Sequence, residues 1–310
     1  MSVDIVTTFD GVNRRFQLIK RLNGFLKELE KCNLKIVIGI QVRDKFDEKI
    51  VKYFTSRYPN AKFACDYKKT SSIGNSKLRN LAINASTAEY LLFLDLDIYP
   101  DSHLIDKIIS GSGTSKIEIY PCVYLTKEGT KLFLKGNQVS NVYSWLKDFR
   151  VRYVQHLAIP SSIVFLPRAI VNAIGGFDEN YVGHGYEDFD FLIRVEEFIS
   201  GKKYSILDLI DEPYNSPIFS IGFRHRLGMY CWDNLKAGDF FVHLWHSRSQ
   251  TKQEDRTVNK RYFEEKLEVK HNLEELVDGN REIYLQEKLS HFNEGDLRRY
   301  EFLFHKFNAK

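Results

Sequence analysis

The sequence predicts an α/β fold, a mostly parallel central sheet flanked by helices, with a helical C-terminal extension. Over the first hundred residues, short apolar runs alternate with amphipathic segments. The alternation continues less regularly to about residue 250, and beyond it the chain is mostly charged, lacks proline and has a helical pattern. Alternation of this kind builds a parallel sheet in which ligands gather at the carboxyl ends of the strands.

The first hundred residues are predicted to hold four strands joined by three helices. The strands are the apolar runs Val3–Thr7 and Tyr90–Leu94, the buried, β-branched run Lys35–Val42 and a segment near Ala61–Cys65. The helices show apolar residues at helical spacing over Phe16–Leu26, Phe46–Tyr58 and Leu78–Ala85.

Further along the chain, strands are predicted at Ile117–Leu125, Ser162–Leu166 and Phe240–Leu244. A glycine-rich loop over Gly175–Gly185 leads into a helix from about Glu187. We therefore predict one domain over residues 1–250, with halves at 1–100 and 101–250, and a helical extension over 251–310.

Composition excludes several classes of protein. Hydrophobic residues make up 43% of the chain, enough for a core, and 45 basic against 41 acidic residues give a net charge of +4. This balance argues against a protein that coats nucleic acid. The four cysteines form no CxxC pair, and the apolar runs are far shorter than the roughly 20 residues of a membrane helix. We expect a cytoplasmic protein with reduced thiols.

A buried strand runs into two carboxylates, Asp95 and Asp97, in a DxD sequence. Because strand side chains alternate between faces, both acids are expected on the same side at the end of the strand. A cation between them would remove their repulsion, and carboxylates suit a divalent ion bound to a diphosphate. A pair of exposed acids at a strand–loop junction is the alternative. Haloacid-dehalogenase-type phosphatases share DxD but need Thr or Val where Tyr99 stands here.

A second polar segment, Gly74–Asn80, opens a predicted helix. Lys77 and Asn80 share its polar face, with Arg79 nearby. A helix start with Lys and Arg beside it can hold a phosphate, and an ordinary solvated helix face is the alternative.

The glycine-rich stretch ends in three acids within four positions, Glu187, Asp188 and Asp190. Near a helix N-terminus the dipole favours their ionised form, and an ionised carboxylate in a cleft can act as a general base for an alcohol. An acidic helix start is the alternative, in which Asp190 pairs with Arg194 at i, i+4.

Two histidines, His243 and His246, follow the last apolar run. They fall on one side of a turn or helix but on opposite faces of a strand, so one metal ligand is the safer expectation. A structural histidine is the alternative.

Taken in order, these residues resemble the nucleotide-sugar glycosyltransferases of the GT-A fold. The chain looks most like the inverting family-2 enzymes of bacterial polysaccharide synthesis and the β-1,4-galactosyltransferase and chondroitin-polymerase group, over roughly residues 1–250. The matching segments are the opening strand and turn Val3–Asp10, the K-L-x-N-like helix start Gly74–Asn80, the DxD motif at Asp95–Asp97, the G-G-F-D-E…G-x-G-x-E-D-x-D stretch Gly175–Asp190, and the late histidines His243 and His246.

The resemblance implies transfer of a sugar such as Gal, GalNAc or GlcNAc from a UDP-sugar to a hydroxyl of a glycan or lipid-linked glycan, with inversion, in capsule or lipopolysaccharide synthesis. It implies Asp188 as general base, and acceptor contacts from Glu187, Asp190 and His184. Residues 1–100 would form the nucleotide-binding half, and the implied donor contacts are Thr7, Phe9, Asp10, Arg14, Lys77, Arg79, Asn80 and Asp95. Mn²⁺, with Mg²⁺ as second candidate, would be held by Asp97 and His246, completed by Asp95 and His243.

The sequence also departs from that group. His184 stands where galactosyltransferases carry Trp, and the QxxRW motif of processive synthases is absent, which favours a single addition. Two alternatives remain: a retaining GT-A transferase, which would give an α-linkage, and a non-catalytic carbohydrate-binding module on a degenerate fold. Every expected catalytic acid is present, which disfavours the module.

The C-terminal tail Arg298–Lys310 contains four basic residues, one acid and several aromatic residues. Such a tail can rest on the anionic inner face of a membrane, where lipid-linked acceptors sit. Packing on its own domain or on a partner subunit is the equal alternative, and the oligomeric state is left open.

Overall fold

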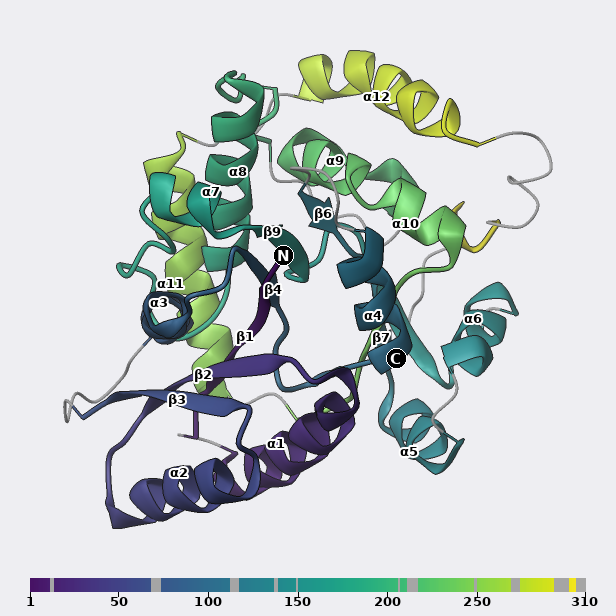
Figure 1. Ribbon diagram of the computed structural model, residues 1–310. Coiled ribbons are helices and arrows are strands. Elements are labelled where there is room, and N and C mark those ends of the chain that lie inside the picture. Colours follow the sequence, from purple (N-terminus) through teal and green to yellow (C-terminus); the bar gives the residue numbers. More distant parts are fainter. Residues whose placement is uncertain are drawn as a thin grey trace. The chain divides into compact units, whose positions relative to one another are not determined.

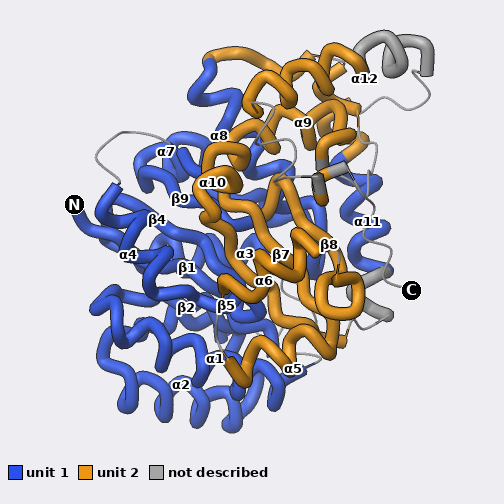
Figure 2. The backbone as a smooth tube through the Cα atoms, turned by 90° about the vertical axis from the view of Figure 1, so that its right-hand side faces the viewer, with its two compact units in different colours: residues 1–118, 162–200, 248–263 blue, residues 119–161, 201–247, 264–310 orange. Residues whose placement is uncertain are grey.

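The chain folds into two compact units whose segments interleave along the sequence (Figure 2). Unit 1 comprises residues 1–118, 162–200 and 248–263, and unit 2 comprises residues 119–161, 201–247 and 264–310. The structure is a computed structural model that describes residues 1–11, 14–67, 74–111, 117–136, 139–148, 150–205, 207–210, 217–247, 250–268, 274–292 and 301–304. The sequence suggested a boundary near residue 250, whereas the segment that follows it packs within unit 1.

Unit 1 contains a sheet with the strand order β3-β2-β1-β4-β9 (Figure 1). Its strands are β1 (Val3–Phe9), β2 (Lys35–Gln41), β3 (Ala61–Asp66), β4 (Tyr90–Phe93) and β9 (Val164–Pro167). β1 pairs in parallel with β2 and β4, β2 pairs in parallel with β3, and β9 runs antiparallel to β4. The predicted mostly parallel sheet is confirmed.

Helices surround this sheet. They are α1 (Arg15–Leu29), α2 (Lys45–Arg57), α3 (Asn75–Ala85), α4 (Ser102–Gly111), α7 (Arg168–Ala173), α8 (Glu187–Ser200) and most of α11 (Gln250–Lys266), with a 3-10 turn η1 (Glu30–Cys32). Right-handed crossovers place α1 and α2 on the same face of the sheet. Their neighbourhood is visible in Figure 1, and the rings of Phe16 and Phe46 lie 6.0 Å apart.

Helix α3 lies directly against the sheet. Gly39 in β2 is required for this approach, because a Cβ there would lie 1.9 Å from the carbonyl oxygen of Leu78. Leu78 and Ala82 are buried on the inner face of the helix. Because α3 follows β3 and returns to the parallel strand β4, its N-terminus lies at the carboxyl edge of the sheet.

Unit 2 contains neighbouring strands β10 (Phe241–His243), β7 (Cys122–Leu125) and β8 (Val154–Ala158). β7 runs parallel to β10 and antiparallel to β8. The single strand predicted over Ile117–Leu125 is wrong: Pro121 lacks a backbone N–H and separates β7 from the short strand β6 (Glu118–Ile119). A second short strand, β5 (Ile98–Tyr99), follows β4 in unit 1.

The helices of unit 2 are α5 (Lys127–Gly136), α6 (Val139–Lys147), α9 (Gly222–Met229), α10 (Trp232–Ala237) and α12 (Glu274–Leu289), with 3-10 turns η2 (Pro217–Phe219) and η3 (Glu301–Phe304). Helices α11 and α12 confirm the helical character predicted for the C-terminal region. Of the predicted tail, residues 301–304 are described, and there Phe302 is buried with its ring 6.5 Å from that of Tyr143. The rest of the tail lies outside the described residues.

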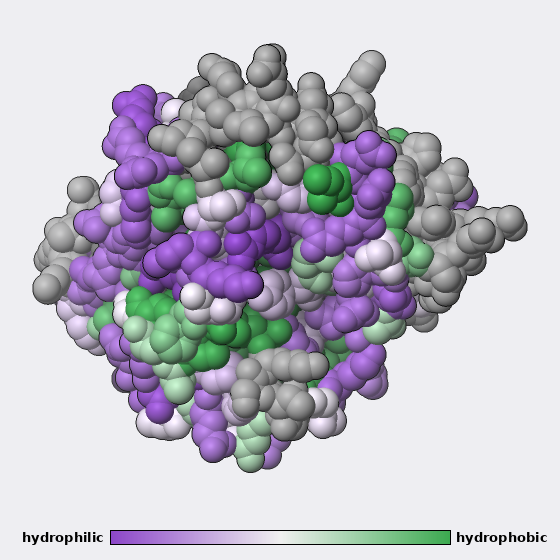
Figure 3. Space-filling view, turned by 90° about the horizontal axis from the view of Figure 1, so that it is seen from above, coloured by the Kyte–Doolittle hydropathy of each residue, from purple (hydrophilic) through white to green (hydrophobic). Residues whose placement is uncertain are grey.

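Two features concern the distribution of hydrophobic residues, on the surface and along the helices. On the face seen in Figure 3, hydrophilic side chains predominate, and hydrophobic ones form one larger group at the lower left and smaller groups elsewhere. Among the described residues, none of the helices combines the length and the apolar character needed to cross a bilayer.

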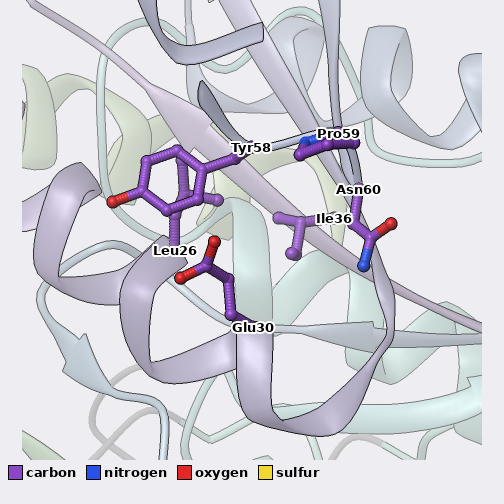
Figure 4. Close-up of a pocket in the computed structure, with 6 residues that line it drawn as sticks. All are labelled: Leu26, Glu30, Ile36, Tyr58, Pro59 and Asn60. Carbon is purple, nitrogen blue, oxygen red and sulfur yellow. The ribbon is translucent and has the colours of Figure 1, made fainter. Parts of the chain in front are cut away.

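A cavity of about 240 Å³ lies in unit 1 (Figure 4). It is lined by Leu26, Glu30, Ile36, Tyr58, Pro59 and Asn60. Ile36, Pro59 and Asn60 lie at the amino ends of β2 and β3, and Leu26 and Glu30 lie at the end of α1 and in η1. This edge of the sheet is opposite to the one at which parallel sheets bind ligands. The cavity is therefore not the candidate active site.

Candidate active site

Arg79, in the second turn of α3, binds three carboxylates at the carboxyl edge of the unit 1 sheet. Its Nη2 lies 3.1 Å from Oδ1 of Asp95, and its Nη1 lies 2.7 Å from Oδ1 of Asp188 and 3.4 Å from Oε1 of Glu187. The guanidinium carbon lies 5.0 Å from the centroid of the Phe177 ring. Since the side chain of Arg79 is only 4% exposed, this is a buried cluster of one cation with three acids.

The two adjacent acids of α8 have opposite electrostatic environments. Burial raises the pKa of Asp188 to about 7; Arg79 opposes this rise, and the charges of Glu187 and Asp95 add to it. Burial also acts to raise the pKa of Glu187, but a hydrogen bond from His184 and the charge of Arg79 outweigh it and hold that pKa below its ordinary value. Asp188 can therefore exchange a proton near neutral pH, while Glu187 stays ionised.

The acids of the DxD sequence lie in a turn and not in the strand. β4 ends at Phe93, and the backbone N–H of Ile98 donates to the carbonyl oxygen of Asp95 over 2.9 Å. Strand alternation therefore does not orient Asp95 and Asp97, and that part of the prediction is wrong. The turn and separate ion pairs orient the two carboxylates instead.

Asp97 is bound by two arginines of the α1 region. Nη2 of Arg14 lies 2.9 Å from its Oδ2, and Nε of Arg21 lies 3.8 Å from its Oδ1. Burial lowers the pKa of Arg21, and the charge of Asp97 opposes that effect. Arg14, a predicted donor contact, is therefore engaged with a predicted metal ligand.

The polar face of α3 also makes contacts of its own. Nζ of Lys77 lies 3.1 Å from Oδ2 of Asp66, at the end of β3. Nδ2 of Asn80 donates to the carbonyl oxygen of Phe177 (2.8 Å) and to Oε1 of Glu179 (3.0 Å), and its Oδ1 accepts the N–H of Phe177 (2.9 Å). The amide of Asn80 thus holds the loop before α8 in place, which favours a structural role over the nucleotide contact predicted for it.

Three predicted donor residues lie at the end of β1. Thr7 and Phe9 are buried within the strand, and Asp10, half-buried, comes directly after it. They lie at the carboxyl end of a parallel strand, the edge at which such sheets bind ligands, and their contact with a nucleotide stays a prediction.

The glycine-rich loop is fastened to α11. Asn259 accepts the N–H of Val182 with its Oδ1 (3.0 Å) and donates from Nδ2 to the carbonyl oxygen of Val182 (2.7 Å). Gly183 has a φ of +62°, and a Cβ there would lie 2.0 Å from Oδ2 of Asp255. Glycine is required at this close approach, and the contacts explain why the start of α11 belongs to unit 1.

The three predicted acceptor residues differ in accessibility. The His184 side chain is 40% exposed, and its Nδ1 lies 3.3 Å from Nδ2 of Asn75 and 3.5 Å from Oε1 of Glu187. Asp190 is fully buried, and its Oδ2 accepts a hydrogen bond from Nε of Arg194 over 2.9 Å. A buried, paired carboxylate offers no surface to a sugar, so the structure favours the i, i+4 pair over the acceptor contact. Glu187 is buried as well.

The two late histidines belong to unit 2. β10 ends at His243, so His246 lies beyond the strand, and the two ring centroids are 5.3 Å apart. Tyr124 of β7 stacks between His243 and His156 of β8, at centroid distances of 4.1 and 4.2 Å. The two imidazoles and the carboxylate of Asp97 are donor types that fit a divalent metal ion.

Sequence reasoning missed four residues around these groups: Arg21, Tyr124, His156 and Asn259. For Arg21 a signal existed, because it lies in α1 two helical turns after Arg14, the residue that precedes the helix. The other three act through contacts across strands or with a distant loop, which no local pattern announces.

Comparisons with known proteins agree with the fold predicted from the sequence. The sequence model of the glycosyltransferase-like family 2 matches residues 26–269. No match is found among curated proteins. The family match, together with the mostly parallel sheet, supports the predicted GT-A fold.

Three solved structures are similar to the chain, each over 63% of its length and with a TM-score of 0.41. TarS of S. aureus is 13% identical, with 33% of its own chain covered. The mannosyltransferase PcManGT from Pyrobaculum calidifontis, in complex with GDP-Man and Mn²⁺, is 12% identical with 52% covered. GalNAc-T7 with UDP, GalNAc and Mn²⁺ is 12% identical with 40% covered. The chain thus spans a third to about half of these proteins.

Proposed function

The chain belongs to the glycosyltransferase-like family 2, and we propose that it acts as an inverting, metal-dependent glycosyltransferase that moves a sugar from a nucleotide sugar to a hydroxyl group of a glycan. The observation that carries the proposal is the contact of one arginine with both Asp95 of the DxD turn and Asp188 of the acidic helix start. It joins a donor-side acid and a candidate base within unit 1.

Asp188 has the properties that a general base needs. Its side chain is 22% exposed, which leaves room for an acceptor hydroxyl, and its pKa is raised to about 7. In the proposed step, the carboxylate takes the hydroxyl proton while the acceptor oxygen attacks the anomeric carbon. The bond from that carbon to the diphosphate oxygen breaks, and the nucleoside diphosphate leaves from the opposite face, which inverts the configuration.

We assign Asp97 and His246 as ligands of a divalent metal, Mn²⁺ first and Mg²⁺ second, with Asp95 and His243 as further candidate ligands. An imidazole ligand favours Mn²⁺ over Mg²⁺. When bound, such an ion neutralises the charge that develops on the departing diphosphate. Arg14 and Arg21 pair with the carboxylate of Asp97, and both are candidates to contact the diphosphate beside the metal.

The remaining donor and acceptor contacts follow the positions of the side chains. Thr7, Phe9, Asp10 and Lys77 lie at the carboxyl ends of the strands or the start of α3, where a nucleotide would bind. His184 is the accessible predicted acceptor residue. A UDP-sugar donor, a role in capsule or lipopolysaccharide synthesis, and a cytoplasmic site of action at the inner face of the membrane complete the proposal.

A screen of nucleotide sugars tests it. We expect nucleoside diphosphate release in the presence of Mn²⁺ and an acceptor glycan, and loss of release with EDTA. NMR of the product then assigns the anomer: a β-linkage from an α-donor is expected, whereas an α-linkage would indicate a retaining enzyme. Binding of sugars without any release would instead indicate a carbohydrate-binding module.

A further inference from the structure

Arg79 connects the donor side and the acceptor side of the proposed reaction. Its Nη2 pairs with Asp95, which follows β4, and its Nη1 pairs with Asp188, which lies in the first turn of α8. The guanidinium group is planar and holds its nitrogens at fixed positions. The two carboxylates are therefore placed in one rigid frame.

Residues that take no part in the proposed reaction hold the side chain of Arg79 in place. The guanidinium lies over the ring of Phe177, whose backbone is bound at both N–H and C=O by Asn80, the neighbour of Arg79 on α3. Glu187, only 1% exposed, takes a further contact of 3.4 Å. A side chain fixed in this way by packing and hydrogen bonds is suited to positioning another group.

The negative charge of the three carboxylates explains why Arg79 is needed to hold Asp188 in place. Three carboxylates face a single guanidinium, and without it they would repel one another in a buried setting. Asp188 is 22% exposed, so its side chain could then turn toward solvent. Arg79 offsets this repulsion and keeps Oδ1 of Asp188 on the side of Asp95.

We infer that Arg79 is a positioning residue of the transfer reaction, which sets the base Asp188 against the donor-side acid Asp95 so that hydroxyl and donor are aligned. The inference rests on the proposed function. In this role Arg79 acts through Asp188 and touches neither substrate. A direct contact of Arg79 with the diphosphate or nucleoside is the competing role.

Arg79→Met, which removes the charge at similar volume, separates the two roles. We expect kcat for transfer to fall about 100-fold, because a misplacement of about 1 Å can have that effect. The Kd of UDP with Mn²⁺, measured by calorimetry, should change by less than about threefold, since binding is not the lost function. A loss of UDP affinity as large as the loss of kcat would overturn the inference in favour of the donor contact.

The double variant Arg79→Met/Asp188→Asn shows whether the two residues act as one unit. If Arg79 works through the base, the double variant is no slower than Asp188→Asn alone. A further loss that multiplies the two single effects would overturn the inference.

Arg194→Met is the matched control. It removes the arginine of another ion pair with a buried aspartate on α8, and we expect it to keep kcat within about threefold of the unmodified chain once folded. A fall as large as that of Arg79→Met would make the effect one of folding and overturn the inference.

Should Arg79→Met fail to fold, Arg79→Lys carries the test. Lysine keeps the charge but cannot bridge two carboxylates with a planar fork, so kcat should still fall while UDP binding persists. Full activity in Arg79→Lys would overturn the inference. Failure of the proposed function is distinct, because then the unmodified chain transfers no sugar from any donor.

Discussion

The first turn of α8 carries two aspartates that differ in how their charge is balanced. Asp188 shares one guanidinium, that of Arg79, with two further carboxylates and remains partly exposed. Asp190, two residues on, is fully buried with an arginine of its own, Arg194, which also donates to the carbonyl oxygen of Ile174. The pair of Asp190 and Arg194 fastens the helix, whereas Asp188, whose pKa burial raises to about 7, stays available for proton transfer.

Replacing each acid by its amide gives the largest expected contrast. Asp188→Asn should lower kcat by about 10²–10⁴-fold, the usual contribution of a general base. Asp190→Asn should act mainly on stability, because its carboxylate faces Arg194 and not the acceptor. Nucleoside diphosphate release measures the first effect, and thermal unfolding the second. Equal losses of kcat in the two variants would contradict the different roles of Asp188 and Asp190.

Arg194→Met tests the ion pair of Asp190 and Arg194 by removing the arginine. The variant leaves the carboxylate of Asp190 buried without its cation, which should reduce the free energy of unfolding by about 3 kcal/mol. Urea unfolding followed by circular dichroism measures this change. A reduction below about 1 kcal/mol would mean that the pair is solvated and does not fasten the helix.

The pH dependence of the reaction tests the role of Asp188 as general base. Since burial raises the pKa of Asp188 to about 7, the carboxyl is protonated below that pH and cannot accept a proton. kcat/KM should therefore fall about tenfold for each pH unit below 7. A profile that is flat between pH 5 and 8 would contradict the assignment.

Stability should respond to pH in the opposite direction. The folded pKa of Asp188 lies above the ordinary 3.8, so its stabilising contribution is present below about pH 4 and is lost as the pH rises toward 7. Asp188→Asn should remove this slope from a plot of unfolding free energy against pH.

Asn80→Ala gives the smallest expected effect. It removes the amide that holds the Phe177 backbone, and should reduce the free energy of unfolding by about 1–2 kcal/mol. Lys77→Ala, which breaks a partly exposed ion pair on the same helix, is the control and should change stability by less than about 1 kcal/mol. The reverse order would show that Lys77, and not Asn80, supports the loop before α8.

Much of the fold could be predicted because its signals are local. The strands β1, β2 and β4 are mostly apolar, and α1 to α3 show apolar residues at helical spacing. The short strands β5 and β8 and the helices α4, α5, α6, α7, α9 and α10 were not predicted, because short elements carry too little pattern to be recognised. The strand predicted over Tyr90–Leu94 extends one residue beyond β4, which ends at Phe93.

The sequence by itself determined which acids gather at the end of β4 and the start of α8, and it determined the family of the chain. Which arginine each acid meets was decided by tertiary structure: Arg79 lies 108 residues before Glu187, yet binds it. Electrostatic interaction depends on distance in space and on burial, and the spacing of residues along the chain predicts neither of them. That is why Asp188 and Asp190, alike in sequence, differ in the folded chain.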